Sequence, residues 1–327
     1  MRKHLIALST CLLTLASATT LLAGTIITRD ADFDRWNYPF NSSPGLRNLA
    51  STFGAIGGGA FDDFDGQFLV GFELSTDLPA LGPGESYLVH SVQVTATHST
   101  GAFAYDPTFD NYATYLDASD PDFVADHDAG RPVELWGAGL RNGYSSFGFA
   151  GPLPPTAPPT FNSGSFFAFA DPTLVDVRNA FAFDPLLGNV SNVITDRLLT
   201  AEAWATGTVA GLSPGAPVAE GVPGVSTGST FTFDVDLSRP EILSYIETGL
   251  GNGQLFFTIA SLHEAAQQAG GTNPNFYTGN NFDPFAVEPT LTIDVEVVPE
   301  PATGLLLVSG GVLCLGLLRR FRRSGAA

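Results

Sequence analysis

The chain has few cysteines and almost no lysine. Its two cysteines, Cys11 and Cys314, each lie inside one of two hydrophobic terminal segments, and its only lysine is Lys3. If both terminal segments are removed, the remaining chain has no cysteine. It then cannot use a thiol nucleophile, a thiolate metal site or a disulfide, so the hydrophobic core must stabilise the fold.

Positive charge is scarce between the two ends of the chain. Residues 19 to 298 contain 8 arginines, no lysine and 32 acidic residues, and 8 − 32 gives a net charge of −24. This field repels phosphate backbones and anionic lipids, so no nucleic-acid partner is expected. The acidity either keeps an exported protein soluble or supports cation binding.

The chain also lacks a recognisable catalytic motif. Gly224–Gly228 matches the G-x-S-x-G string, but prolines precede it and a strand-like run follows. A serine hydrolase needs a strand before this string and a helix after it. Four histidines lie beyond the first segment, and none has metal-ligand spacing: His90, His98, His127 and His263. We therefore expect that the protein is not an enzyme.

The N-terminal segment has the three parts of a secretory signal peptide. A basic start precedes the almost wholly apolar run Leu5–Leu15, and small residues follow at 16–18. An apolar run of this length is too short for a comfortable membrane span. We predict export and removal of residues 1–18 by signal peptidase. Because residues 21–24 extend the apolar run, cleavage as late as residue 24 is the alternative.

The C-terminal segment combines a short motif, an apolar run and a basic cluster. The motif is Val298-Pro299-Glu300-Pro301, the uncharged run covers residues 302–318, and the cluster follows at once: Arg319, Arg320, Arg322 and Arg323. At about 1.5 Å per residue the run is roughly 26 Å long, near the lower limit for a transmembrane helix. The arginines favour a cytoplasmic C-terminus and an outside body, which agrees with the signal peptide.

These three ordered elements resemble the PEP-CTERM sorting signal of exosortase substrates. The resemblance covers residues 298–323 and leaves the rest of the chain unassigned. It implies a Gram-negative source, recognition by a membrane-embedded exosortase and cleavage near Pro299-Glu300-Pro301. The expected route is an inner-membrane intermediate held by the C-terminal transmembrane helix, then the cell surface or the extracellular biofilm matrix. A permanent single-span anchor is the alternative.

Residues 25–297 form the body, which contains short strand-like runs separated by Gly, Pro, Asn and Asp. The clearest run is Tyr87–His98, where apolar and polar side chains alternate as in a half-buried strand. Further runs occur at Phe68–Leu74, Pro132–Trp136, Phe166–Phe169, Ala201–Val209, Thr230–Leu237, Gln254–Ser261 and Thr290–Val297. The pattern predicts an all-β fold, an antiparallel β-sandwich of jelly-roll type.

One short helix is predicted at residues 239–248. Ser238 and Glu241 have the spacing of a capping box, and Gly249 follows as a stop signal. The proline-rich stretch 151–160 is either an interdomain linker or a crossover loop within one sandwich. The crossover loop is favoured, because neither flank alone has a complete set of strands.

Acidic residues gather in two runs that suit an oxygen-rich metal loop. The first run is Asp62–Gly66. The second holds the candidate calcium ligands Asp117, Asp120, Asp122, Asp126 and Asp128. Ca²⁺ prefers oxygen ligands on flexible loops, although acidic residues are also common in solvated turns. Calcium at the second run is the one cofactor that the sequence suggests.

Aromatic residues beside polar or Gly-rich segments are candidates for stacking on sugar rings. They are Trp36, Tyr38, Trp136 and Tyr144, and core packing is the alternative for each of them. The expected function is a non-catalytic structural, adhesive or carbohydrate-binding role in the envelope or biofilm matrix, with exopolysaccharide as partner. The alternative is a secreted glycan-active hydrolase that uses paired carboxylates.

Overall fold

The computed structural model describes residues 24–39, 41, 43, 45–54, 65–150, 159–165, 178–191, 198–264 and 272–299. The signal peptide, the run Phe166–Phe169 and the apolar run 302–318 lie outside these residues. Within the described part of the chain, no helix is long and apolar enough to cross a membrane.

The chain divides into two compact units. The smaller contains residues 1–26, 79–90 and 294–327, and the larger contains Ile27–Leu78 and Ser91–Ile293. In the smaller unit the Tyr87 hydroxyl donates a hydrogen bond to the Pro79 carbonyl at 2.7 Å, and His90 Nε2 lies 3.2 Å from Glu296 Oε2. The candidate sites described below belong to the larger unit.

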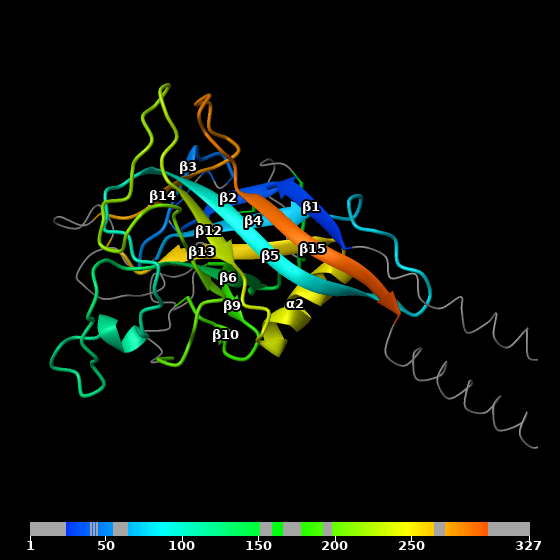
Figure 1. Cartoon of the computed structure of the whole chain (residues 1–327), viewed down its shortest axis with the longest axis horizontal. Coiled ribbons are helices and arrows are strands. Elements are labelled where there is room, and N and C mark those ends of the chain that lie inside the picture. The colour runs from blue at the N-terminus through cyan, green and yellow to red at the C-terminus, as the bar shows by residue number, and fades with distance from the viewer. Residues whose placement is uncertain are drawn as a thin grey trace, which may run out of the picture. The chain divides into compact units, whose positions relative to one another are not determined.

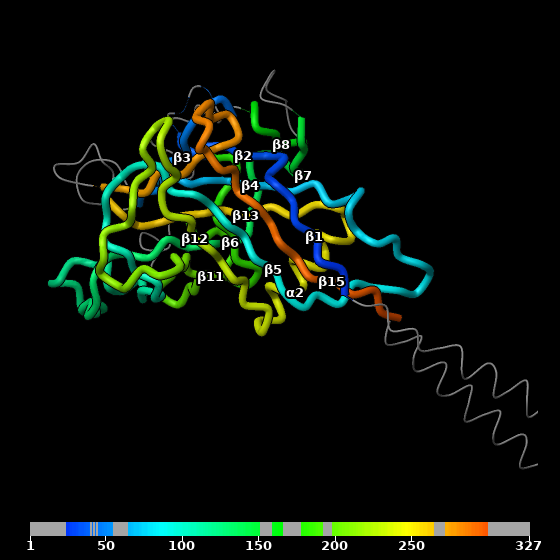
Figure 2. Tube along the Cα trace, turned by 45° about the horizontal axis from the view of Figure 1, so that its top comes forward, coloured from blue at the N-terminus to red at the C-terminus, as the bar shows by residue number. Residues whose placement is uncertain are grey.

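Two antiparallel sheets give the chain a mostly β, sandwich-like structure (Figure 1). The six-stranded sheet has the order β1-β15-β5-β14-β3, and β12 also pairs with β5. Its strands are β1 (Thr25–Asp30), β3 (Leu49–Ser51), β5 (Glu85–Thr100), β12 (Thr230–Asp234), β14 (Asn275–Tyr277) and β15 (Thr290–Pro299). In Figure 2 the blue trace of β1 runs beside the orange trace of β15, so the first and last strands are neighbours.

The seven-stranded sheet has the order β10-β9-β6-β13-β4-β2, and β11 also pairs with β6. Its strands are β2 (Phe33–Asn37), β4 (Gln67–Glu73), β6 (Val133–Leu140), β9 (Ala180–Asp184), β10 (Gly188–Asn189), β11 (Ala205–Thr206) and β13 (Gln254–Ser261). The remaining elements are β7 (Ser146–Phe147) and β8 (Thr160–Phe161), which pair in parallel, the 3₁₀ helix η1 (Tyr112–Tyr115) and the helix α2 (Pro240–Gly251).

The core lies between the two sheets and is rich in phenylalanine. Phe68 of β4 stacks on Phe276 of β14 with ring centroids 6.3 Å apart, and Phe231 of β12 meets Phe276 edge-on at 5.7 Å. All three side chains are buried. Burial of such large apolar side chains is the main favourable term in folding, so the described core needs no disulfide.

Most predicted strands are confirmed, and one is largely wrong. The run Tyr87–His98 lies inside β5, and Gln254–Ser261 coincides with β13. The predicted strand Ala201–Val209 is reduced to Ala205–Thr206. The backbone N–H of Trp204 donates to the Leu135 carbonyl and that of Gly207 donates to the Val133 carbonyl, so this run touches β6 only briefly.

The helix is confirmed, but its predicted cap is wrong. The N-cap of α2 is Arg239, which makes no capping hydrogen bond through its side chain. Ser238 lies one residue before this N-cap, and its hydroxyl donates a hydrogen bond to Asp236 Oδ1 at 2.6 Å. The helix also continues past Gly249 to Gly251. The chain turns at Gly253, whose φ of 70° suits glycine.

The proline-rich stretch 151–160 separates two strands of one sheet. β6 precedes the stretch, β9 follows it, and the two pair antiparallel from Gly137↔Phe183 to Leu140↔Ala180. Residues 151–158 themselves lie outside the described part of the chain.

Candidate functional site

The seven-stranded sheet splits at one end, between β6 and β13. These strands pair from Val133↔Ser261 to Gly137↔Phe257. Beyond that point β6 continues to pair with β9, and β13 continues to pair with β4. The ends of β6 and β13 therefore diverge, which leaves backbone groups that need other partners.

Tyr245 of α2 supplies those partners with one hydroxyl group. The hydroxyl accepts a hydrogen bond from the Ala138 N–H at 3.2 Å and donates one to the Phe256 carbonyl at 2.8 Å. Burial raises the pKa of Tyr245 to about 12, so the hydroxyl stays protonated and keeps its proton to donate. The side chain thus replaces the missing backbone hydrogen bonds between β6 and β13 and fixes α2 beside the split.

A pocket of about 770 Å³ lies at this split, between α2, the end of β9 and the segment after β6. We call it the aromatic pocket, because its described lining includes six rings: Tyr144, Phe147, Phe181, Phe183, Tyr245 and Phe256. This volume is in the range of small-ligand sites in proteins.

The rings of the pocket are held by one another and by a nearby cation. Phe147 stacks on Phe256 with centroids 4.3 Å apart, and the Arg141 guanidinium lies 4.7 Å from the centre of the Phe181 ring. Gly139 makes room for Phe181, because an added Cβ there would lie 2.5 Å from a ring carbon. The rings are therefore fixed before any ligand arrives, which lowers the entropic cost of binding.

Polar side chains surround the rings. Ser145, Ser244, Thr248 and Asn252 line the pocket and are exposed, and Gln254 lines it and is half-buried. Their hydroxyl and amide groups can both donate and accept hydrogen bonds. An aromatic floor with an uncharged polar rim suits a ligand that has apolar faces and hydroxyl edges.

Glu241 is the one carboxylate among the described lining residues. Its Oε1 lies 2.9 Å from Arg239 Nε, and the pKa of Glu241 is lowered by a hydrogen bond from its own backbone N–H and by the Arg239 contact. Glu241 is therefore held in its ionised form, whereas the general acid of a glycosidase needs a raised pKa.

Tyr144 is the one predicted sugar-stacking residue that lines the pocket. Trp136 is only 1% exposed, and its indole N–H donates to Glu134 Oε2 at 3.2 Å. Tyr38 is buried and stacks on the half-buried Trp36 at 4.6 Å. The structure therefore does not bring the four aromatic candidates together, since Trp136 is buried on β6 and Trp36 and Tyr38 stack on each other away from the pocket lining.

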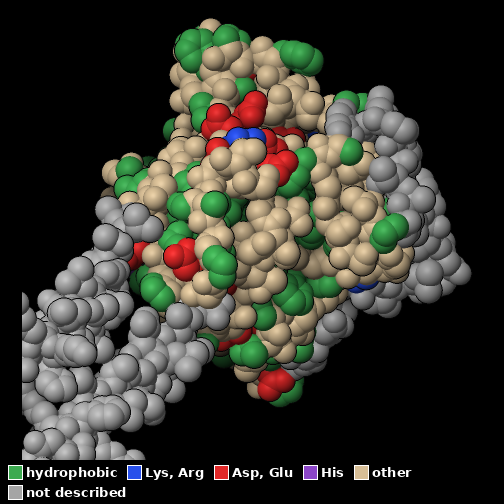
Figure 3. Space-filling view, turned by 90° about the vertical axis from the view of Figure 1, so that its right-hand side faces the viewer, with side chains coloured by type: hydrophobic (Ala, Val, Ile, Leu, Met, Phe, Trp, Pro, Cys, Tyr) green, Lys and Arg blue, Asp and Glu red, His purple; other side chains and the backbone are tan. Residues whose placement is uncertain are grey.

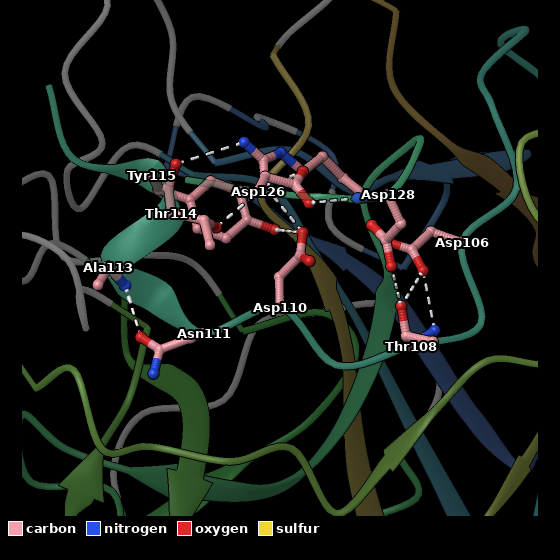
Figure 4. A network of polar contacts seen from close by, with 10 residues as sticks. Asp106, Thr108, Asp110, Asn111, Ala113, Thr114, Tyr115, Asp126 and Asp128 are labelled. Carbon is pink, nitrogen blue, oxygen red and sulfur yellow. Dashed lines mark hydrogen bonds and ion pairs between the residues drawn. The ribbon is translucent and has the colours of Figure 1, made fainter. Parts of the chain in front are cut away.

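The predicted calcium run is divided by the structure. Asp117 and Asp120 accept hydrogen bonds from the backbone N–H two residues ahead, at 2.8 and 2.9 Å, as in ordinary solvated turns. Asp122 is also exposed. Asp128 instead reaches Thr108, which precedes η1, and Asp126 lies 2.9 Å from Arg131 Nη1, which also contacts Asp110 (Figure 4). In the other acidic run, Asp65 is buried and lies 2.5 Å from the Arg178 guanidinium.

The residues that Asp126 and Asp128 reach complete a group that we call the carboxylate cluster. It consists of Asp106, Asp110, Asp126, Asp128 and Arg131. Oxygen atoms of three of the acids lie within 4.8 Å of one another. Arg131 Nη1 lies 2.8 Å from Asp110 Oδ2 and 2.9 Å from Asp126 Oδ2.

Gly130 allows the two halves of the cluster to approach. Its φ is 111°, a conformation that side chains disfavour, and an added Cβ would lie 2.7 Å from the Ala104 carbonyl oxygen. The same Cβ would lie 3.1 Å from the Cβ of Asp106. A larger residue at position 130 would separate residues 126–131 from Asp106.

A buried carboxyl group lies near the cluster on β6. Glu134 is 2% exposed and accepts hydrogen bonds from the Tyr112 hydroxyl at 2.8 Å and from the Trp136 indole. Burial raises the pKa of the Glu134 carboxyl to about 7, although these two hydrogen bonds lower it and the Asp110 charge adds to the rise.

The sequence analysis missed Tyr245, Asp106 and Asp110. Asp106 and Asp110 lie in the segment before η1, and their spacing in Asp106-Pro107-Thr108-Phe109-Asp110 carried the only signal. Tyr245 lies on the predicted helix, but its role depends on the split of the sheet, which no local pattern shows. No protein-family model matches this chain, and no curated protein matches its sequence.

Proposed function

We propose that this chain is an exported envelope or biofilm-matrix protein of a Gram-negative bacterium, and that its body binds a polysaccharide without cleaving it. The observation that carries the binding role is the aromatic pocket at the split of β6 and β13. Sugar rings have apolar faces that pack on aromatic rings and hydroxyl edges that form hydrogen bonds. The half-buried rings of Tyr144, Phe181 and Phe183 and the polar rim match those two features.

Binding is favoured over hydrolysis by the arrangement of carboxylates. Glycoside hydrolysis needs a pair of carboxyl groups about 5 to 10 Å apart on either side of the scissile bond. Glu241 is the one carboxylate that lines the described part of the pocket, and hydrogen bonds from its own backbone N–H and from Arg239 lower its pKa. The acids that do lie close together, Asp106, Asp110 and Asp128, are not among the lining residues. A secreted hydrolase is therefore the weaker proposal.

Most of the surface on one face is uncharged, as Figure 3 shows, and acidic side chains gather there around a basic group. Pairs of this kind include Arg29 with Asp32 at 2.5 Å and with Asp77 at 3.2 Å. Such local pairing occupies arginines in the described part of this acidic chain, which supports a neutral rather than a strongly anionic polysaccharide as ligand.

Sorting by exosortase is the second part of the proposal. β15 ends at Pro299, so the last strand of the body leads directly into Glu300-Pro301. The proposed cleavage site thus follows directly after the last described strand of the body. The C-terminal transmembrane helix, the inner-membrane intermediate and the final place at the cell surface or in the matrix belong to this proposal.

The jelly-roll arrangement also belongs to the proposal. In both sheets the paired strands include some that are far apart in the sequence, such as β1 with β15 and β4 with β13. The chain must therefore cross between the sheets repeatedly, as it does in jelly rolls.

Binding is tested with the full chain purified in mild detergent and screened on an array of neutral and acidic bacterial polysaccharides. We expect a neutral glycan to bind, and Phe181→Ala to weaken binding about tenfold by removing one stacking surface. Phe282→Ala is the matched control, because Phe282 is 92% exposed and does not line the pocket. Equal loss in both variants, or release of reducing sugar from the bound glycan, would contradict the proposal.

Sorting is tested by the intact mass of the protein from its own cells. We expect a C-terminus near residues 298–301 and no Cys314. Changing Pro299 and Glu300 to alanine leaves the apolar run intact, so a permanent anchor predicts no change in mass or location. Accumulation of a longer form in the inner membrane supports exosortase processing, and a native C-terminus at Ala327 would refute it.

A further inference from the structure

The carboxylate cluster has an excess of negative charge that its own cation does not balance. Four acids, Asp106, Asp110, Asp126 and Asp128, surround Arg131, and −4 + 1 gives a formal charge of −3. Arg131 contacts Asp110 and Asp126. Among the described residues, Arg131 forms no ion pair with Asp106 or Asp128, so the excess is concentrated at those two acids.

Asp106 shows where a ligand is needed. The residue is 2% exposed, and its Oδ2 is buried and has no hydrogen-bond partner among the described residues. Leaving a buried carboxylate oxygen without a donor costs free energy comparable to a lost hydrogen bond or more. The same carboxylate offers one oxygen within 4.8 Å of oxygens of Asp110 and Asp128, so the group is suited to binding a cation.

Thr108 makes the deficit of donors larger. Its hydroxyl oxygen lies 2.6 Å from Asp106 Oδ1 and 2.7 Å from Asp128 Oδ2, as Figure 4 shows. A hydroxyl carries one hydrogen, so it can donate to only one of these oxygens at a time. The hydroxyl oxygen and the carboxylate oxygen that receives no hydrogen are then held in close contact, so they repel each other. A bound cation would remove this repulsion.

We propose that Asp106, Asp110 and Asp128 bind one calcium ion. The ligand atoms are all carboxylate oxygens, which hard cations prefer, and they come from irregular segments that can adjust to the large, flexible coordination sphere of Ca²⁺. Mg²⁺ is smaller and demands a nearly regular octahedron, which such a loop provides less readily. This site keeps Asp128 of the five acids suggested by the sequence and replaces the others with Asp106 and Asp110.

The site explains the shape of residues 104–131. Asp106 and Asp110 lie before η1 and Asp128 lies after it, so one ion would connect the two chain segments that flank η1. Calcium would then hold residues 104–131 against β6, whose Glu134 contacts Tyr112 of η1. The proposal does not depend on polysaccharide binding, because none of its ligands lines the aromatic pocket.

The test uses the full chain in mild detergent after treatment with a chelator. Extracellular calcium sites commonly bind with Kd of about 0.1 to 1 mM, so about 10 mM calcium should raise the Tm by about 3 °C or more. Mg²⁺ at the same concentration should raise it less. Terbium should show tyrosine-sensitised emission, because the Tyr115 hydroxyl lies 3.4 Å from Asp110 Oδ2.

Two variants locate the site. Asp106→Asn keeps an oxygen that accepts from Thr108 but removes the negative charge and one of the two carboxylate oxygens. Asp128→Asn changes an exposed side chain, so the fold should tolerate it. Both should lose the calcium-dependent rise in Tm and the terbium emission. Asp117→Asn is the matched control and should keep both, because Asp117 bonds only within its own turn.

Several results would overturn the proposal. They are an unchanged Tm and no terbium emission in the parent protein, an equal rise with Mg²⁺, or a full calcium response in Asp128→Asn. If Asp106→Asn does not fold, Asp128→Asn and the terbium signal still decide the question.

Discussion

The aromatic pocket and the carboxylate cluster are built in opposite ways. The pocket is formed by the ends of regular elements, β6, β9, β13 and α2, and its described lining contains one carboxylate. The cluster is formed by irregular segments on either side of η1 and holds four carboxylates and one guanidinium. In the pocket, backbone geometry creates the site. In the cluster, charge creates it.

The two regions also satisfy their buried polar groups differently. Beside the pocket, the Tyr245 hydroxyl is used fully, once as acceptor and once as donor. Near the cluster, Glu134 Oε1 and Asp106 Oδ2 are buried without a hydrogen-bond partner among the described residues. The first region should therefore be insensitive to pH and ions near neutrality, and the second should respond to both.

The largest expected effect is on the pH dependence of stability. The pKa of Glu134 is about 7 in the folded chain and 4.5 ordinarily, so the folded chain binds more protons between these values. The free energy of unfolding should fall by about 3 kcal/mol as pH rises from 4.5 through 7 on account of this group. Glu134→Gln should remove that contribution, measured as the difference between variant and parent in urea unfolding at each pH.

The difference measurement is needed because a buried histidine acts in the opposite direction. Burial lowers the pKa of His263 to about 3, so stability from this group is lost as pH falls from 6.5. Glu247→Gln, at an exposed position on α2, is the matched control for replacing a glutamate by glutamine. A flat difference for Glu134→Gln would mean that Glu134 is solvated.

A pair of tyrosines gives the next largest effect and compares the regions directly. Tyr245→Phe should lower the free energy of unfolding by about 2 kcal/mol, because the Ala138 N–H and the Phe256 carbonyl lose their partner. The loss should be equal at pH 5 and pH 8. Tyr112→Phe removes a donor from Glu134, so its cost should be greater at pH 8, where the carboxylate is charged.

The measurement is urea unfolding of both variants at the two pH values. A loss for Tyr245→Phe that grows with pH, or a loss for Tyr112→Phe that does not, would contradict the distinction between a neutral and a charged region.

The sequence predicted the regular elements better than the sites between them. The alternation in Tyr87–His98 and the apolar run Gln254–Ser261 identify β5 and β13, because a strand that faces a core has a local two-residue period. The position of α2 is likewise a local property. The cap of α2 was predicted wrongly, and the Ser238 hydroxyl donates a hydrogen bond to Asp236, which the capping pattern does not include.

The candidate sites depend on contacts that no local pattern contains. Trp136 was a candidate for sugar binding because a Gly-rich segment follows it, yet it is buried against Glu134, since β6 lies in the interior of the sheet. Asp128 was placed with its sequence neighbours, yet it meets Asp106, since Gly130 lets the chain return past Ala104. The composition indicated that acidic and aromatic residues are abundant, and the topology of the fold determines which of them lie close together.

The smallest expected effect tests whether charge alone governs the cluster. Thr108→Val removes the one hydroxyl between Asp106 and Asp128 and keeps the volume of the side chain. In chelator this should lower the free energy of unfolding by about 1 kcal/mol, because two carboxylates lose a shared donor. In calcium the loss should be smaller, because the cation itself balances the negative charge of the two carboxylates. Thr108→Ser keeps the hydroxyl and should behave like the parent in both conditions, apart from the lost methyl group.

Urea unfolding of the three proteins with and without calcium gives the answer. If Thr108→Val costs the same in both conditions, the hydroxyl and the cation act on different oxygens, and the cluster is then held by Arg131 and its hydrogen bonds rather than by an ion.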